Sequence, residues 1–237
     1  MKRSSFLASS ASLAAFAGGI ADAAQSVPGG AHFVERKADF NEAEFAKIVG
    51  RPADIRQVWE AVAFHPAMFN NVKNALNGLQ FGYGYAPGRI SVAVAPHGPS
   101  SAYTYSDYLW SKYRIGEAFS TKDAKGNAVT SNIFLKPAKA LDKNADPDSE
   151  DSVYQDTSIE TLQSRGVVFL TCHTAVEEQA RNLVKGGFAP AGMTAPQVAD
   201  DILTHLIAGT HVVPSMVATI AVLQQRFNYS YITLAMA

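Results

Sequence analysis

The sequence predicts an α/β protein built on a mainly parallel β-sheet with helices on both faces. Short apolar runs alternate with amphipathic helical patterns, in the order strand, helix, strand, helix, insertion, helix, strand, helix, helix, strand, helix, strand. Residues 90–95 and 167–171 are mostly apolar, as strands buried on both faces are. The 237 residues, 47% of them hydrophobic, suffice for one sizeable core. Strands that alternate with helices pair in parallel through right-handed crossovers.

The first half of the chain supplies two of these strands. Residues 56–64 alternate between apolar and polar and form the first strand, and residues 90–95 form the second. A helix precedes them at residues 40–49 and ends before Pro52, which cannot continue it. Between the strands, Pro66 favours the start of another helix. The apolar stripe of that helix consists of Met68, Val72, Ala75, Leu76 and Leu79.

The third predicted strand lies at residues 167–171. An aromatic-rich helix at 107–113 and a short helix at 158–165 precede this strand. A helical pattern follows it directly, which predicts a junction between strand and helix at Cys172 and His173. The apolar face of the following helix holds Val176, Ala180, Leu183 and Val184.

The last part of the chain repeats the alternation. Residues 194–197 match a capping box and begin a helix that Gly209 ends. Residues 212–213 form a short strand, and a helix with an apolar stripe follows it. Residues 229–234 form the final strand.

The pattern divides the chain into a signal peptide at 1–23, an N-terminal extension at 24–55 and one α/β domain at 56–237. Within the domain, residues 115–157 lack a sustained apolar period and are rich in polar and turn-forming residues. Because such a stretch has no face to bury, we interpret it as a surface insertion and not as a separate domain.

The first residues have the layout of an export signal. Lys2 and Arg3 form a short positive region, residues 6–20 are Ala-rich and mildly apolar, and residues 21–23 form a small-x-small cleavage site. The route is either Sec or a degenerate twin-arginine signal. The apolar stretch is too short and too weakly apolar for a stable membrane anchor. These features predict a periplasmic protein.

Charge and cysteine content restrict the partners. The formal net charge is −1 and no Lys/Arg cluster is present, which argues against nucleic acid and anionic membranes. Cys172 is the single cysteine, so the chain contains no internal disulfide. In an exported protein, such a cysteine is either buried or kept for chemistry.

Cys172 is the first candidate site residue. Ligands of parallel sheets bind beyond the carboxyl ends of the strands, and this rule places His65, His97 and Cys172 at one edge. A cysteine at the start of a helix lies at the positive end of the helix dipole, which favours the reactive thiolate. The alternative is that Cys172 is a small buried hydrophobic residue.

Histidines are the candidate partners of this thiol. His97, in the loop after the second strand, is the better candidate, although it could instead satisfy backbone groups of its loop. His173 is adjacent in sequence, so its side chain can point away. Cys172 with His173, His97 and His65 could form a metal site, but no metal-binding spacing supports one, and we expect neither metal nor cofactor.

Two further stretches are candidates for a functional role. The acidic residues 142–148 lack the Gly and Glu of a calcium loop and are interpreted as a solvated loop. The aromatic segment after His97 could line a pocket, form a subunit interface or pack in the core. Its members are Tyr103, Tyr105, Tyr108, Trp110 and Tyr113.

Several segments together resemble the DsrE/DsrF-like family. They are residues 166–172 (GVVFLTC), 212–224 (VVPSMVATIAVLQ) and 229–232 (YSYI), with Val94-Ala-Pro-His97-Gly98 similar to the His-Gly that ends the second strand in exported members. The resemblance implies a small α/β fold with a mainly parallel sheet, assembled as a homo-oligomer, often a trimer or hexamer. It also implies that Cys172 carries sulfur as a persulfide and passes it to a partner.

The sequence thus leads to a periplasmic sulfur-handling protein that carries or transfers sulfane sulfur on Cys172. His97, Gly98 and His173 are the predicted binding residues, and the predicted partner is a sulfur donor or acceptor protein or a small sulfur compound. Two alternatives stay open. One is a non-catalytic periplasmic ligand-binding or assembly module of the same fold, and the other is a binder of a metal or redox ligand.

Overall fold

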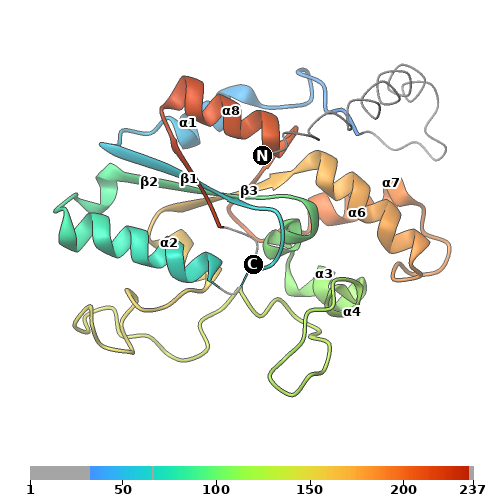
Figure 1. Ribbon diagram of the computed structural model, residues 1–237. Coiled ribbons are helices and arrows are strands. Elements are labelled where there is room, and N and C mark those ends of the chain that lie inside the picture. Colours follow the sequence, from blue (N-terminus) through green and yellow to red (C-terminus); the bar gives the residue numbers. More distant parts are fainter. Residues whose placement is uncertain (1–32, 66, 235–237) are drawn as a thin grey trace, which may run out of the picture. The chain divides into compact units, whose positions relative to one another are not determined.

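A five-stranded, all-parallel sheet forms the centre of the protein in a computed structural model that describes residues 33–65 and 67–234 (Figure 1). Its strands lie in the order β4-β3-β2-β1-β5. This confirms the predicted α/β class. The strands are β1 (Ile55–Ala61), β2 (Ile90–Pro96), β3 (Val167–Cys172), β4 (Thr210–Val213) and β5 (Ser230–Thr233).

Helices α2 (Met68–Asn77) and α5 (Ile159–Ser164) cover one face of the sheet. Phe69 of α2 packs there with Trp59 and Phe169 from the strands. The chain steps in one direction from β1 through β4, and right-handed crossovers place α2, between β1 and β2, and α5, between β2 and β3, on the same side. A 3-10 helix at Pro87–Arg89 and a π-helical turn at Gly78–Gly82 complete the connection from α2 to β2.

The opposite face is covered by α1 (Glu42–Val49) and α8 (Met216–Phe227), which lie above the sheet in Figure 1. After β4 the chain returns across the sheet to pair β5 with β1, and this reversal of direction places α8 on the second face. Val58, Ala93 and Leu170 form the floor beneath these helices and are fully buried. The sheet is therefore buried on both faces, as its apolar strands require.

A third cluster packs at one end of the sheet. It is built by α3 (Asp107–Lys112), α4 (Ile115–Ala118), α6 (His173–Lys185) and α7 (Ala195–Thr204), with a 3-10 segment at Gly98–Thr104. Core packing accounts for most of the aromatic segment, because only Tyr108 among its five members is exposed. Tyr103, Tyr105, Trp110 and Tyr113 are fully buried.

The stretch predicted as a surface insertion contributes residues to two of these clusters. Ile115, Val129 and Leu135 are buried, and the Asn132 side chain donates hydrogen bonds to the backbone carbonyls of Tyr103 and Tyr105. The acidic residues 142–148 lie in turns and are mostly exposed. Buried apolar residues at irregular intervals thus anchor this stretch, although its sequence has neither the periodicity of a helix nor that of a strand.

Element ends differ from the prediction at the first strand. β1 ends at Ala61, and Phe64 leaves the strand to join an aromatic cluster, with its ring centroid 4.8 Å from that of Tyr103. The N-terminal extension contributes α1 to the sheet cover, and β1 already begins at Ile55. Within the described residues, no helix combines the length and hydrophobicity of a membrane span. The predicted signal peptide lies outside the described residues.

Candidate functional site

The carboxyl ends of β2 and β3 bring two predicted site residues to one edge of the sheet. His97 follows the last residue of β2, and Cys172 is the last residue of β3. These strands pair in parallel, with Val94 opposite Phe169, so both residues lie beyond the same edge. The edge is the one at which ligands of open parallel sheets bind.

The sulfur of Cys172 lies at the N-termini of two helices. Its Sγ accepts a hydrogen bond from the N–H of Ala175 in α6, at 3.4 Å, and another from the N–H of Met216, the first residue of α8, at 3.3 Å. N–H groups of a first helical turn have no partner within their own helix and carry the positive end of its dipole. Both donors therefore favour negative charge on the sulfur. The residue is 4% exposed.

A polar chain links the loop after β2 to α6 beside this thiol. The Tyr105 hydroxyl donates to the side chain of Gln179, and Gln179 in turn donates to the carbonyl oxygen of Gly98. The pKa of Tyr105 is raised, first by burial and then by charge on Cys172. Gly98 has a φ of 57°, and a Cβ there would lie 3.2 Å from the carbonyl oxygen of Val62. Glycine thus suits this turn.

His97 is paired with a carboxylate on the neighbouring strand. Its Nε2 lies 2.9 Å from Oε1 of Glu60, whose second oxygen accepts a hydrogen bond from the Tyr231 hydroxyl. That hydrogen bond raises the pKa of Tyr231, and burial adds to the effect. Among the described residues, no hydrogen bond joins His97 to Cys172. Sequence reasoning missed Glu60, whose only signal was an acidic residue near the end of the first strand.

His173 begins α6, and its side chain lies near acidic residues. Its Nε2 lies 3.9 Å from Oε1 of Glu177, one turn further along the helix. Burial raises the pKa of Glu35, and the charge of His173 opposes that rise. The carbonyl of Phe33 accepts a hydrogen bond from Thr174, at 3.1 Å. The segment that precedes α1 therefore lies against the start of α6.

The histidines and the cysteine do not form a metal centre in the described part of the chain. No group of three or more His, Cys, Asp or Glu side chains there lies close enough together to hold a metal ion. His65 instead uses Nδ1 to accept a hydrogen bond from the N–H of Ala67, at 3.1 Å. This contact supports the start of α2.

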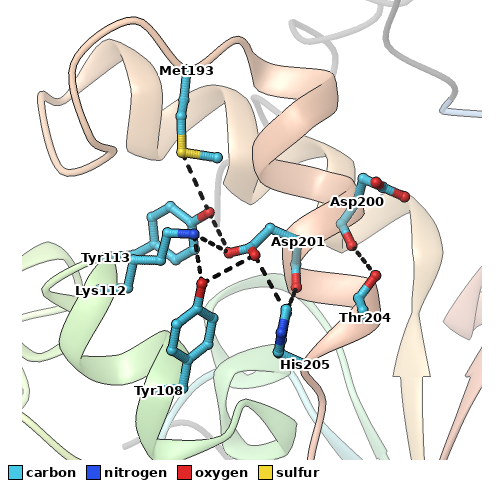
Figure 2. A network of polar contacts seen from close by, with 8 residues as sticks. All are labelled: Tyr108, Lys112, Tyr113, Met193, Asp200, Asp201, Thr204 and His205. Carbon is cyan, nitrogen blue, oxygen red and sulfur yellow. Dashed lines mark hydrogen bonds and ion pairs between the residues drawn. The ribbon is translucent and has the colours of Figure 1, made fainter.

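A second polar cluster joins α3 to α7 (Figure 2). Asp201 accepts hydrogen bonds from the hydroxyl of Tyr113 at 2.7 Å, the ammonium of Lys112 at 3.0 Å and the hydroxyl of Tyr108 at 3.2 Å. The imidazole of His205 lies 3.3 Å from the same carboxylate. Because the cluster connects two helices that also share apolar contacts, it serves to fix their packing.

Comparisons of this chain with protein-family models, with curated proteins and with solved structures found no match. The fold and the site therefore define the class of protein by themselves. It is an α/β protein with a five-stranded parallel sheet, in which one buried cysteine at the sheet's carboxyl edge lies on the N-termini of two helices.

Proposed function

We propose that this protein handles sulfur in the periplasm by carrying or transferring sulfane sulfur on Cys172. One observation carries the proposal, namely the two helix N–H groups, of Ala175 and Met216, that donate to the Cys172 sulfur. A carrier needs a sulfur that is stable as an anion, both as thiolate and as persulfide. N–H donors from two helix N-termini favour both anions without a metal or a cofactor.

The transfer step is a thiol–disulfide type of exchange. The thiolate of Cys172 attacks the outer sulfur of a polysulfide or of a persulfide donor, and a new S–S bond forms at Cys172. The S–S bond of the donor breaks, and the donor leaves with the electron pair as a shorter thiolate or polysulfide anion. Attack by an acceptor thiolate on the outer sulfur of the Cys172 persulfide completes the transfer.

The remaining parts of the proposal follow from the resemblance to DsrE/DsrF-like proteins. His97 and Gly98 belong to the loop beside the thiol, and Gln179 connects that loop to α6. In the proposal this loop orients the donor or the acceptor, which is a protein or a small sulfur compound, and the protein acts as a homo-oligomer. Light scattering after size-exclusion chromatography tests the oligomer, and a monomer at every concentration contradicts it.

Loading of sulfur tests the proposal directly. Intact mass spectrometry after incubation with polysulfide is expected to show the addition of sulfur, its removal by a reductant, and no addition in the Cys172→Ser variant. Ser conserves the shape and the capping role of residue 172 but lacks the nucleophile. Addition of sulfur to the variant, or none to the native wild-type protein, would contradict the proposal.

A second candidate is a non-catalytic binding or assembly module, and the burial of the thiol favours it. Cys172 is 4% exposed and packs with Leu170, Val213 and Met216 in an apolar cluster. In this alternative the cysteine only fills space. A native thiol that reacts with a maleimide as slowly as the protein unfolds would support it, whereas labelling much faster than unfolding would exclude it.

A further inference from the structure

A cavity of about 330 Å³ lies at the other end of the sheet from Cys172. Its walls come from α2, from the end of the 115–157 stretch and from the residues just before β3. Ile90, at the start of β2, forms part of its floor, and β2 extends from there toward the carboxyl edge over about 20 Å. The volume falls in the lower range of small-molecule sites, which is roughly 300–1,000 Å³.

Two cationic side chains line this cavity and give it positive charge. They are Arg165, which follows α5, and Lys143, from the stretch between α4 and α5. Within the described part of the chain, no Asp or Glu lines the cavity and no carboxylate forms an ion pair with either side chain. Arg165 is partly buried, and a cation removed from water is ordinarily paired with an anion.

The guanidinium of Arg165 is held in place but only partly hydrogen-bonded. Its Nη2 donates to the side-chain oxygen of Asn77 at 2.7 Å, and its central carbon lies 4.9 Å from the centre of the Tyr154 ring. Its Nη1 is buried and has no hydrogen-bond partner among the described residues. Burial also lowers the pKa of Arg165. A guanidinium held in place at the wall of a cavity is suited to binding a carboxylate.

Most of the remaining wall is apolar, with Gln80 and Ser164 as its other polar residues. Leu76 and Ile90 are 4% exposed and lie beneath the cavity, while Pro87 and Val153 border it. A small inorganic anion would leave this apolar surface in contact with water. A ligand that joins a carboxylate to an apolar body would satisfy both parts of the wall.

We propose that this cavity binds a small organic carboxylate, with Arg165 and Lys143 contacting the carboxylate and the apolar wall contacting the body of the ligand. The proposal gives the 115–157 stretch a role, because it supplies Lys143, Val153 and Tyr154 to the site. The proposal is independent of sulfur transfer at Cys172, which lies at the opposite edge of the sheet.

The test is a titration of the full-length protein followed by amide NMR, with hexanoate as the probe. We expect saturable shifts at the amides of residues 143, 153, 154 and 165. The neutral analogue hexanamide and inorganic sulfate are expected to bind at least about tenfold more weakly, because each lacks one of the two recognised features. Equal binding of hexanoate and hexanamide, or no shifts at these amides, would overturn the proposal.

Substitutions test whether Arg165 and Lys143 contribute to hexanoate binding. Arg165→Gln is expected to weaken hexanoate binding at least about tenfold, and Lys143→Gln several-fold. Lys125→Gln makes the same change of charge at an exposed lysine outside the cavity and should bind as the wild type does. Because Lys143 is exposed, Lys143→Gln still tests the proposal if Arg165→Gln does not fold. Wild-type affinity for hexanoate in Lys143→Gln would refute the role of Lys143 in the site.

Discussion

Asp201 on α7 is expected to contribute measurably to stability, and a conservative substitution tests its role. Its side chain is only 15% exposed and accepts hydrogen bonds from Lys112 of α3 and from Tyr113, which directly follows α3 (Figure 2). Asp201→Asn preserves the shape of the side chain and removes its charge. Asp200→Asn makes the same chemical change at an exposed position next to it and serves as the matched control.

The expected cost follows from those two hydrogen bonds. A hydrogen bond to a charged group contributes about 1.5–3 kcal/mol, against about 0.5–1.5 kcal/mol for a neutral one, so each bond loses about 1 kcal/mol. Asp201→Asn should therefore lower the free energy of unfolding by about 2 kcal/mol. For a domain of this size the melting temperature should fall by about 4–8 °C. The control should change the free energy by less than about 0.5 kcal/mol. Urea unfolding measures both values.

The difference between wild type and Asp201→Asn should also depend on pH. Burial raises the pKa of Asp201, but the hydrogen bonds from Tyr113 and Lys112 outweigh it and hold the pKa below 3.8. A carboxylate whose pKa is lower in the folded state stabilises the protein above its unfolded pKa, and this stability is lost as the pH falls through the folded pKa. The difference should therefore be constant near neutral pH and shrink below about pH 4. A difference that is the same at every pH, or equal stabilities of the two variants, would refute this reasoning.

Two further substitutions test local geometry. Gly116→Ala would place a Cβ in steric conflict with the backbone of Val129 and should cost at least about 2 kcal/mol. Gly78→Ala meets no atom within 4 Å and should be neutral or stabilising by up to about 1 kcal/mol. Equal melting temperatures of the two variants in calorimetry would contradict this. Glu60→Gln should lower the pKa of Tyr231 toward its ordinary value of 10.0, because the hydrogen bond to Glu60 is the main cause of its rise. An NMR titration of the tyrosine ring measures that pKa, and an unchanged value would exclude Glu60 as the cause.

The strands were predictable from sequence because parallel strands buried on both faces leave compact apolar runs. β2 and β3 were found within one residue of their ends for this reason. β1 was predicted too long, since Phe64 continues the apolar pattern but belongs to an aromatic cluster. Burial of Ile115 and Val129 was missed, because isolated apolar residues carry no period.

The surroundings of the candidate site were less predictable, because they depend on strand order and on helix placement. The position of Cys172 at the start of a helix could be predicted from the local pattern alone. The second donor, Met216, lies 44 residues further along the chain and reaches the sulfur only because α8 begins at the same edge. Glu60 reaches His97 because β1 and β2 are neighbours, and Tyr231 joins them because β5 pairs with β1. None of these pairings can be predicted from the local periodicity of the sequence.

The proposed role of Cys172 is tested most directly by the intact mass of the native protein after incubation with polysulfide, measured beside Cys172→Ser and beside urea-unfolded protein. The folded wild type is expected to gain sulfur on Cys172 and to release it to a reductant, and the variant is expected to gain none. A folded protein that gains no sulfur, while the unfolded chain does, would show that Cys172 is a packing residue and would contradict the proposed function.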